Sequence, residues 1–256
     1  MTDVNAFRNQ TMQNIFNSAV CVRQHEITAA VYEASRGLVQ AGPFRGMHLL
    51  RETSWGAGEI CPKLLGYYEA ELHAHMAEVR AKGFPLVVNV GCAEGYYAVG
   101  LARRMPESRV IAYDVSPAAQ AVCRAAAQAN GVAGRVEVRG LCTRETLQAD
   151  LAGAGPAFLL VDCEGAELGL LDPVAVPGLA GCDILVECHD FLDRNITPAL
   201  LSRFAATHDA ERIEEGARNP NHPLLRRVAS LDRWLAVCEF RPEAMHWLMF
   251  RTKANR

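Results

Sequence analysis

The stretch LVVNVGCAEGYYAVGLA, residues 86–102, contains the strongest fold signal of the chain. A short run of strand-forming residues leads into Gly-Cys-Ala-Glu-Gly, and a helical pattern follows it. Glycines at 91 and 95 remove side chains where a strand turns sharply into a helix, so the backbone can approach a neighbouring group closely. Free amides at the start of such a helix can bind a polar group. The stretch therefore predicts a strand–bend–helix unit.

The same rhythm continues over the next hundred residues. We expect strands near 86–90, 109–113, 135–139, 157–162 and 183–188. The clearest helix is 117–129, which Ser116 and Pro117 begin and Asn130 and Gly131 end. Repeated β-α-β units predict an α/β, doubly wound fold, with a mostly parallel sheet and helices on both faces.

The two ends of the chain differ from this middle part. Residues 1–83 are expected to form a helical extension, because apolar residues recur every three or four positions, most clearly in 63–83. Residues 84–256 are expected to form the α/β domain, with closing strands at 207–214 and 244–251.

Composition excludes several classes of protein. Half of the 256 residues are hydrophobic and 21% are charged, which is usual for a globular protein. The net charge of −3 lacks the positive field of a nucleic-acid binder, and no apolar run is long enough to span a membrane. The polar N-terminus shows no secretory signal, and nine dispersed cysteines without a C-x-x-C pair suit a reducing compartment. We therefore expect a cytoplasmic protein without nucleic-acid or membrane partners.

Chemically active residues follow several of the predicted strands. In an open parallel sheet, ligands bind beyond the carboxyl ends of the strands, near the point between the first and fourth strands where the strand order reverses. Strand one ends in the glycine bend, strand two in Asp114, strand four in VDCEGAE and strand five in VECHD. Asp114 can accept hydrogen bonds from two ribose hydroxyls. Its alternative role is to cap the helix that Ser116 and Pro117 begin.

The glycine spacing distinguishes between cofactors. A dinucleotide loop has the pattern G-x-G-x-x-G, but here Ala93 and Tyr96 occupy the second and third glycine positions. A tyrosine is too bulky for the third position, so NAD is disfavoured. The spacing fits better the loop that holds the methionine part of S-adenosylmethionine, which contacts no pyrophosphate.

Four motifs in order resemble a known family. VVNVGCAEGYYAVGLA, YDVSP, LLVDCEGAELGLL and LVECHDF together resemble the class I S-adenosylmethionine-dependent methyltransferases. The run DCEGAE resembles the FkbM-type branch, whose members show Asp-x-Glu-Gly-x-Glu. The resemblance covers residues 84–190 and implies a Rossmann-like, seven-stranded sheet whose last strand is antiparallel. It also implies methyl transfer, typically to a hydroxyl of a sugar or natural product.

The resemblance implies a set of cofactor contacts. Gly91 and Gly95 would shape the cofactor loop, Asp114 would hold the ribose, and Leu141 and Cys142 would lie near the adenine. The full expected set is Asn89, Gly91, Cys92, Ala93, Gly95, Tyr96, Asp114, Val115, Leu141, Cys142 and Asp162.

Two positions depart from the family pattern. An acid is common where this chain has Asn89, which keeps polar bonding but loses a charge facing the amino-acid end of the cofactor. The usual asparagine of the loop is replaced by Ala93 or Glu94. Neither change affects the close backbone approach.

Methyl transfer to a hydroxyl also needs a general base. Candidates follow strands four and five: Asp162, Glu164, Glu187, His189 and Asp190. We expect Asp162, His189 and Glu187 to be the catalytic residues, because His189 titrates near neutral pH and Asp162 stands where an acceptor approaches the methyl group. The alternatives are a structural histidine and an aspartate that caps a helix.

No metal is expected, but a divalent cation remains an alternative. It would be held by Asp162, Glu187, His189 and Asp190, and it would lower the pKa of the acceptor.

The segment before the first strand contains Trp55, Tyr67, Tyr68, Glu69 and Glu71. It could cover the cofactor site as a lid that excludes water. Equally, it could pack on the sheet or form a homodimer contact.

The sequence thus predicts an S-adenosylmethionine-dependent methyltransferase that acts on oxygen in a small-molecule acceptor. N-methylation, metal-assisted transfer, a non-catalytic cofactor-binding protein and a nicotinamide-dependent oxidoreductase are the alternatives.

Overall fold

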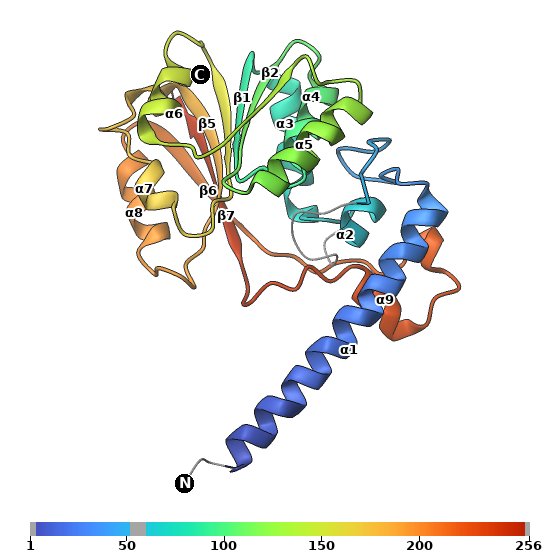
Figure 1. Ribbon diagram of the computed structural model, residues 1–256. Coiled ribbons are helices and arrows are strands. Elements are labelled where there is room, and N and C mark those ends of the chain that lie inside the picture. Colours follow the sequence, from blue (N-terminus) through green and yellow to red (C-terminus); the bar gives the residue numbers. More distant parts are fainter. Residues whose placement is uncertain (1–3, 52–59, 254–256) are drawn as a thin grey trace.

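The computed structural model describes residues 4–51 and 60–253 (Figure 1). Its centre is a seven-stranded sheet with the order β3-β2-β1-β4-β5-β7-β6. The strands are β1 (Leu86–Val90), β2 (Arg109–Tyr113), β3 (Val136–Arg139), β4 (Ala157–Val161), β5 (Cys182–Glu187), β6 (His208–Glu214) and β7 (His246–Thr252). β7 is antiparallel to β5 and β6, whereas the other neighbours are parallel. The predicted fold class is confirmed.

The strand order reverses at β1, as the sequence predicts. β1 lies between β2 and β4, and its residue Asn89 is in register with Ala112 on β2 and Leu160 on β4. The predicted boundaries of β1, of β2 and of the helix at 117–129 match the structure. The carboxyl ends of β1 and β4 are therefore adjacent, which brings the glycine bend beside Asp162.

Helices cover both faces of the sheet (Figure 1). Successive strand residues point to opposite faces, so Val87 enters the core beneath α3, α4 and α5, while Val88 enters the core beneath α6, α7 and α8. The α-helices are α1 (Val4–Ser35), α2 (Ile60–Leu65), α3 (His73–Lys82), α4 (Tyr96–Arg104), α5 (Pro117–Ala129), α6 (Arg144–Leu151), α7 (Glu167–Leu170), α8 (Ile196–Phe204) and α9 (Ser230–Ala236). The described residues also contain three 3-10 turns, η1 (Ala70–Leu72), η2 (Pro177–Gly181) and η3 (Pro223–Leu225).

The helix expected over 63–83 is interrupted, which corrects the prediction. α2 ends at Leu65, the backbone adopts positive φ at Gly66 (79°) and Glu69 (45°), and α3 begins only at His73. The cause lies in distant sequence: a Cβ on Gly66 would be 2.2 Å from the carbonyl oxygen of Ala41. Only a glycine fits beside Ala41 at this position. The turn at Gly66 brings Tyr68, which follows it, to the cavity at the carboxyl ends of the strands.

The N-terminal extension contributes to the core of the sheet domain. The predicted boundary at 83/84 lies in the link between α3 and β1, but Ile27, Leu64 and Val79 share one hydrophobic cluster with strand residues. The first part of α1 instead projects away from the body (Figure 1). Trp55, expected near the site, lies outside the described residues. No described helix combines the length and apolar character that a membrane span requires.

We predict that the turn at Gly66 limits stability through space and not only through backbone conformation. Gly83 has a similar φ of 67°, but a Cβ at Gly83 would meet no atom within 4 Å. Gly83→Ala should therefore lower the free energy of unfolding by only about 1 kcal/mol, the cost of a left-handed backbone conformation for a residue with a Cβ. Gly66→Ala should lower the free energy of unfolding by about 3 kcal/mol, because the loop at Ala41 must also move. Urea unfolding of both variants measures this, and equal losses would contradict it.

Candidate active site

A cavity of about 480 Å³ lies just beyond the carboxyl ends of β1 to β5. Most of the expected residues line it: Asn89, Gly91, Cys92, Ala93, Tyr96, Asp114, Val115, Leu141, Cys142, Asp162, Glu187 and His189. Gly95 and Asp190 are not among its lining residues. Parallel strands end at the same edge of a sheet, so residues far apart in the sequence meet here.

The glycine bend is required by contacts within the protein. Gly91 has φ 78°, and a Cβ there would lie 1.6 Å from the carbonyl oxygen of Asp162. Gly95 has φ 92° at the start of α4, and its Cβ would lie 2.9 Å from the Cys123 sulfur. The expected close approach exists, but at these two positions the approached groups belong to the chain itself. Gly95 shapes the bend from behind and does not line the cavity.

Asp114 fixes the bend from the end of β2. Its Oδ2 accepts a hydrogen bond from the Ala93 amide at 2.8 Å, and its Oδ1 accepts one from the Ser116 amide at 2.8 Å. Ala93 has φ 46°, an unfavourable conformation for a residue with a Cβ, which surrounding contacts must hold. Asp114 thus serves the helix start, which is the alternative role that the sequence predicts. Its half-buried carboxylate also lines the cavity and retains acceptor capacity.

Two buried polar groups at the cavity have no hydrogen-bond partner in the part of the chain that the structure describes. Asn89 is 1% exposed, and neither its Nδ2 nor its Oδ1 bonds to a described residue. The buried hydroxyl of Tyr96 is in the same condition. Both residues line the cavity. Because an unsatisfied buried polar group costs roughly 1–3 kcal/mol, these groups indicate a polar ligand at this end of the cavity.

A buried ion pair that the sequence motifs do not indicate lies beside them. The Lys63 ammonium, on α2, is 2.7 Å from Oε1 of Glu94, and both side chains are nearly fully buried. The ammonium also lies 4.4 Å from the centroid of the Tyr68 ring. All three residues line the cavity. No local motif signals Lys63, because the sheet and α2 meet only through tertiary packing.

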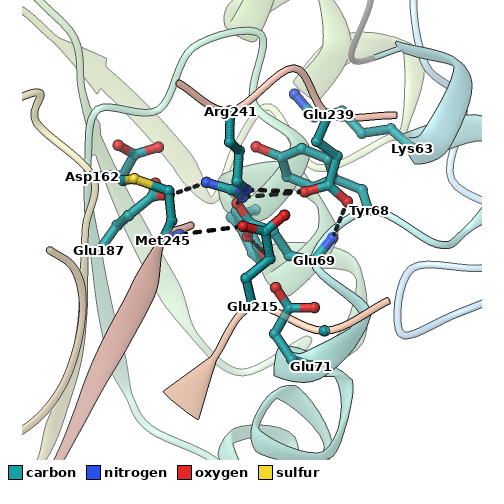
Figure 2. A network of polar contacts seen from close by, with 12 residues as sticks. Lys63, Tyr68, Glu69, Glu71, Asp162, Glu187, Glu215, Glu239, Arg241 and Met245 are labelled. Atoms are coloured by element: carbon teal, nitrogen blue, oxygen red, sulfur yellow. Dashed lines mark hydrogen bonds and ion pairs between the residues drawn. The ribbon is translucent and has the colours of Figure 1, made fainter. Parts of the chain in front are cut away.

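Arg241 organises a second buried network (Figure 2). Its guanidinium lies between Glu187 on one side and Glu69 and Glu239 on the other, donating to Glu187, to Glu69 at 2.9 Å and to Glu239 at 3.2 Å. It also lies 4.7 Å from the centroid of the Trp247 ring. Glu187, expected to be catalytic, therefore lines the cavity with its carboxyl bonded to Arg241.

A second arginine extends this network outward. Arg218 donates to Glu239 at 2.9 Å and to Glu71 at 2.5 and 3.0 Å. Glu69 and Glu71 belong to the segment expected to be a lid, and Tyr68 from the same segment lines the cavity. That segment therefore contacts the site through residues of the turn between α2 and α3. Arg218 and Arg241 lie in a long irregular connection without a motif, so no pattern in the sequence signals them.

Carboxyl groups outnumber guanidinium groups in this network. Glu69, Glu71, Glu187 and Glu239 face only two arginines. Burial and the neighbouring Glu187 raise the pKa of Glu69 to about 8, against the opposing effect of Arg241. Burial and the neighbouring charge of Asp162 likewise raise the pKa of Glu187 to about 8. Both shifts favour the protonated carboxyl, so the network carries less negative charge than four ionised carboxylates would give it.

His189 is oriented by a carboxylate. Its Nδ1 is 2.7 Å from Oε1 of the fully buried Glu167. Its Nε2 faces Oδ1 of Asp162 at 3.6 Å and Oε2 of Glu164 at 3.5 Å. Burial opposes a charge on His189, but the bond to Glu167 and the charges of nearby glutamates outweigh burial and raise its pKa above 6.5. The sequence favours a titrating His189 but does not identify Glu167 as the carboxylate that tunes it.

Three of these side chains could also hold a cation. One ligand atom each from Asp162, Glu164 and His189 lie within 4.8 Å of one another. The expected set differed, because it contained Glu187 and Asp190 in place of Glu164.

Asp190 faces away from the cavity, which corrects its expected place in a metal site. Its Oδ1 accepts a hydrogen bond from the Thr197 amide in the first turn of α8 at 3.1 Å, and its Oδ2 lies 3.8 Å from Nε2 of His246. His189 and Asp190 are consecutive residues that point in different directions, so only the first reaches the site.

Comparisons with known proteins match the part of the chain that carries the glycine bend, Asp114 and Asp162. A family model described as a methyltransferase domain matches residues 87–162, which run from β1 through β4 to Asp162. No curated protein matches the sequence.

Several solved structures are similar to this chain. An O-methyltransferase from Bacillus cereus in complex with SAH is 14% identical with a TM-score of 0.47, over 89% of this chain and 90% of that one. The O-methyltransferase TomG from Streptomyces achromogenes, in complex with SAM, is 13% identical with a TM-score of 0.46, over 68% and 76%. An rRNA methylase from Streptococcus thermophilus is 13% identical with a TM-score of 0.47, over 71% and 96%.

We predict that the proton on Glu69 makes stability depend on pH. A carboxyl whose pKa is raised from 4.5 to about 8 by folding contributes stability below pH 4.5 that is lost as pH rises to 8. Glu69→Gln removes this loss. The free energy of unfolding of the variant, relative to wild type, should therefore increase from pH 5 to pH 8, by at most about 1.4 kcal/mol per pH unit.

The matched control is Glu78→Gln. The ion pair with Arg251 lowers the pKa of Glu78 to about 2, so this carboxyl stays ionised from pH 5 to pH 8 and its replacement should have a constant effect. Urea unfolding at both pH values measures the two differences. A pH-independent difference for Glu69→Gln would show that Glu69 is ionised in the fold.

Proposed function

We propose that this chain is a cytoplasmic S-adenosylmethionine-dependent methyltransferase of the FkbM type, which methylates a hydroxyl of a small natural-product or sugar-type metabolite. One observation carries the proposal: buried, unpartnered polar groups of Asn89 and Tyr96 line a cavity at the strand-order reversal. The match of residues 87–162 to a methyltransferase domain supports it, because that range contains the glycine bend, Asp114 and Asp162.

The residues at the cavity fit the parts of this cofactor. The Asn89 amide offers an acceptor for an ammonium group and a donor for a carboxylate, the two charged groups of an amino-acid tail. Asp114 retains acceptor capacity for ribose hydroxyls. Leu141, 66% exposed at the cavity wall, and Cys142 offer apolar surface to an adenine. No further glycine is needed, in keeping with a cofactor that lacks a pyrophosphate.

The chain's residues then have distinct tasks. When bound, S-adenosylmethionine supplies a methyl group on a sulfonium, an electrophile that needs no further activation. Asn89 and Asp114 fix its position, and the cavity walls limit access of water. Holding two reactants in line supplies most of the acceleration that such a transfer needs. The remaining task is removal of the acceptor proton.

His189 is placed to take that proton. With Nδ1–H donated to Glu167, the lone pair of Nε2 faces the cavity between Asp162 and Glu164. Glu167 fixes this tautomer and stabilises the imidazolium that forms, as in other base–carboxylate pairs. Asp162 is placed to orient the acceptor hydroxyl toward Nε2. Glu187 is bonded to Arg241, so we assign it to the supporting network.

The acceptor end of the cavity suits a small molecule. Apolar side chains of Leu170, Phe191, Phe240 and Met245 line it near the acidic groups. A volume of about 480 Å³ is in the range of small-molecule sites. These features favour a partly apolar metabolite with hydroxyl groups over a macromolecule.

A metal-assisted reaction is the second candidate. The Asp162, Glu164 and His189 atoms within 4.8 Å favour it, and so does the bond from Nδ1 to a buried carboxylate, which is common for metal-bound histidines. A divalent cation there would lower the pKa of the acceptor hydroxyl and replace the base.

We predict opposite effects of Asn89→Leu on ligand binding and on stability. Leucine has nearly the shape of asparagine but no polar groups, so the ligand-free protein should unfold at the same or a higher temperature. The Kd for S-adenosylmethionine should increase about 10- to 100-fold, because two hydrogen bonds are lost. Calorimetric titration and thermal unfolding measure the two effects.

Wild type titrated with NAD is the control, and we expect no binding. Tight binding of NAD, or unchanged S-adenosylmethionine affinity in Asn89→Leu, would contradict the cofactor assignment. A large loss of stability in the ligand-free variant would show that Asn89 has a structural role instead.

We predict that His189 and Glu167 act on turnover and not on cofactor affinity. The assay follows labelled methyl from S-adenosylmethionine into a panel of small hydroxyl compounds. His189→Gln should lower kcat about 10²- to 10⁴-fold, the usual contribution of a general base. Glu167→Gln keeps a hydrogen-bond acceptor but removes its charge, so a smaller decrease is expected. The Kd for the cofactor should stay unchanged in both variants.

The matched control is His25→Gln, an exposed histidine on α1, which should retain full turnover. Loss of turnover with a chelator, restored by Mg²⁺, would favour the metal-assisted reaction. Tight cofactor binding without methylation of any compound would favour a non-catalytic binding protein.

A further inference from the structure

The first part of α1 stands free of the body of the protein (Figure 1). Residues 10–19 are all exposed, whereas Ile27, Thr28 and Val31 further along the same helix are buried in the core. An isolated helix of this length is only marginally stable in water. Its side-chain hydrogen bonds, Gln10 to Asn14 and Gln13 to Asn17, contribute only tenths of a kcal/mol.

This free segment has two different faces. At 100° per residue, Met12, Ile15, Phe16, Ala19 and Val22 fall within about 120° of one another on one face. The four large side chains among them are 58% to 62% exposed. The hydrogen-bonded glutamine and asparagine amides occupy the opposite face. The helix therefore presents an apolar stripe, defined by these five residues, to solvent.

The sequence around the stripe shows which partner it suits. No charged residue occurs from residue 9 to residue 22, although 21% of the chain is charged. A helix that binds a membrane surface usually carries Lys and Arg on its polar face, and this one carries uncharged amides. Two copies of such a segment can approach without like-charge repulsion.

We propose that the apolar stripe pairs with the same stripe of a second copy, as an antiparallel two-fold helix dimer. Antiparallel pairing centred near Asn17 places Met12 opposite Val22 of the second copy, and Ile15 opposite Ala19 of the second copy. Phe16 then lies next to a small residue of the other helix, which leaves room for its ring. The stripe is thus self-complementary, as a two-fold interface requires.

The base of α1 offers further apolar surface to the same partner. α9 is joined to α1 by the ion pair between Arg23 and Asp232, at 2.5 and 3.0 Å. α9 exposes Leu231 (71%) and Trp234 (54%). In an antiparallel pair the tip of each α1 is directed toward the α9 region of the other copy. The interface can then include Leu231 and Trp234 of α9 as well as the helix pair. The proposed dimer does not depend on the proposed methyl transfer.

The test is the mass of the full chain in solution over a wide range of concentrations, by sedimentation or light scattering. Wild type should be a dimer. Phe16→Asp places two charges in the interface and should weaken dimerisation roughly 100-fold or more. Asn14→Asp adds the same charge on the opposite face and keeps the oxygen that accepts from Gln10, so it should remain a dimer. Phe16 lies outside the body, so the near-UV circular dichroism spectrum should not change.

Cysteine cross-linking tests the orientation. In a Cys21→Ser background, Met12→Cys combined with Val22→Cys should form disulfides between copies, while each single variant should not. Cross-linking of either single variant would indicate parallel helices and contradict the proposal. A wild-type chain that is monomeric at every concentration would overturn the proposed dimer. If that monomer also sediments with anionic phospholipid vesicles, the apolar stripe binds a membrane instead.

Discussion

The site depends on the contact between Gly91 and the backbone of Asp162. A Cβ at Gly91 would lie 1.6 Å from the Asp162 carbonyl oxygen, so the bend after β1 and the bend after β4 can be adjacent only if residue 91 has no side chain. This contact brings the loop proposed to hold the cofactor against the residue proposed to orient the acceptor. Asp114 then fixes the other side of the bend through the Ala93 amide. Three strand ends are thereby held together, those of β1 and β4 by a backbone contact and that of β2 by the Asp114 carboxylate.

Charge balance constrains the remaining part of the site. Arg241 bonds to Glu69, Glu187 and Glu239, which come from the N-terminal extension, from β5 and from the connection before β7. A buried guanidinium stabilises the fold only if its partners satisfy it, and the excess of carboxyls favours the protonated form of Glu69 and Glu187. Removing Glu239, which bonds to both Arg218 and Arg241, would leave two buried guanidinium groups without their shared partner. The network thus ties three distant segments into one wall, and it anchors Glu69 and Glu71 of the extension to the sheet domain.

Local pattern and the topology of parallel sheets account for the part of the site that the sequence predicts. Gly91, Asp114 and His189 each come directly after a predicted strand, and Asp162 is the last residue of one. Parallel strands bring these ends to one edge of the sheet. Prediction from sequence fails where placement depends on distant packing. Lys63 and Glu69 reach the site only because Gly66 turns against Ala41, and nothing within 63–83 reveals that contact. Arg241 lies in an irregular connection without periodicity. Asp190 was misplaced because the direction of each side chain after β5 depends on how the chain turns toward α8.

The N-terminal extension therefore has two physically different parts, although apolar residues recur at helical spacing in both. From Ile27 onward it shares the core and supplies Lys63, Tyr68 and Glu69 to the cavity region, so its sequence is constrained by burial and charge. Residues 10–19 are all exposed, yet Met12, Ile15 and Phe16 place large apolar side chains on one face. Burial within one copy cannot account for that pattern, whereas burial between copies can. The ion pair between Arg23 and Asp232 lies at the boundary between the part of α1 that packs on its own copy and the part proposed to pack on a second copy.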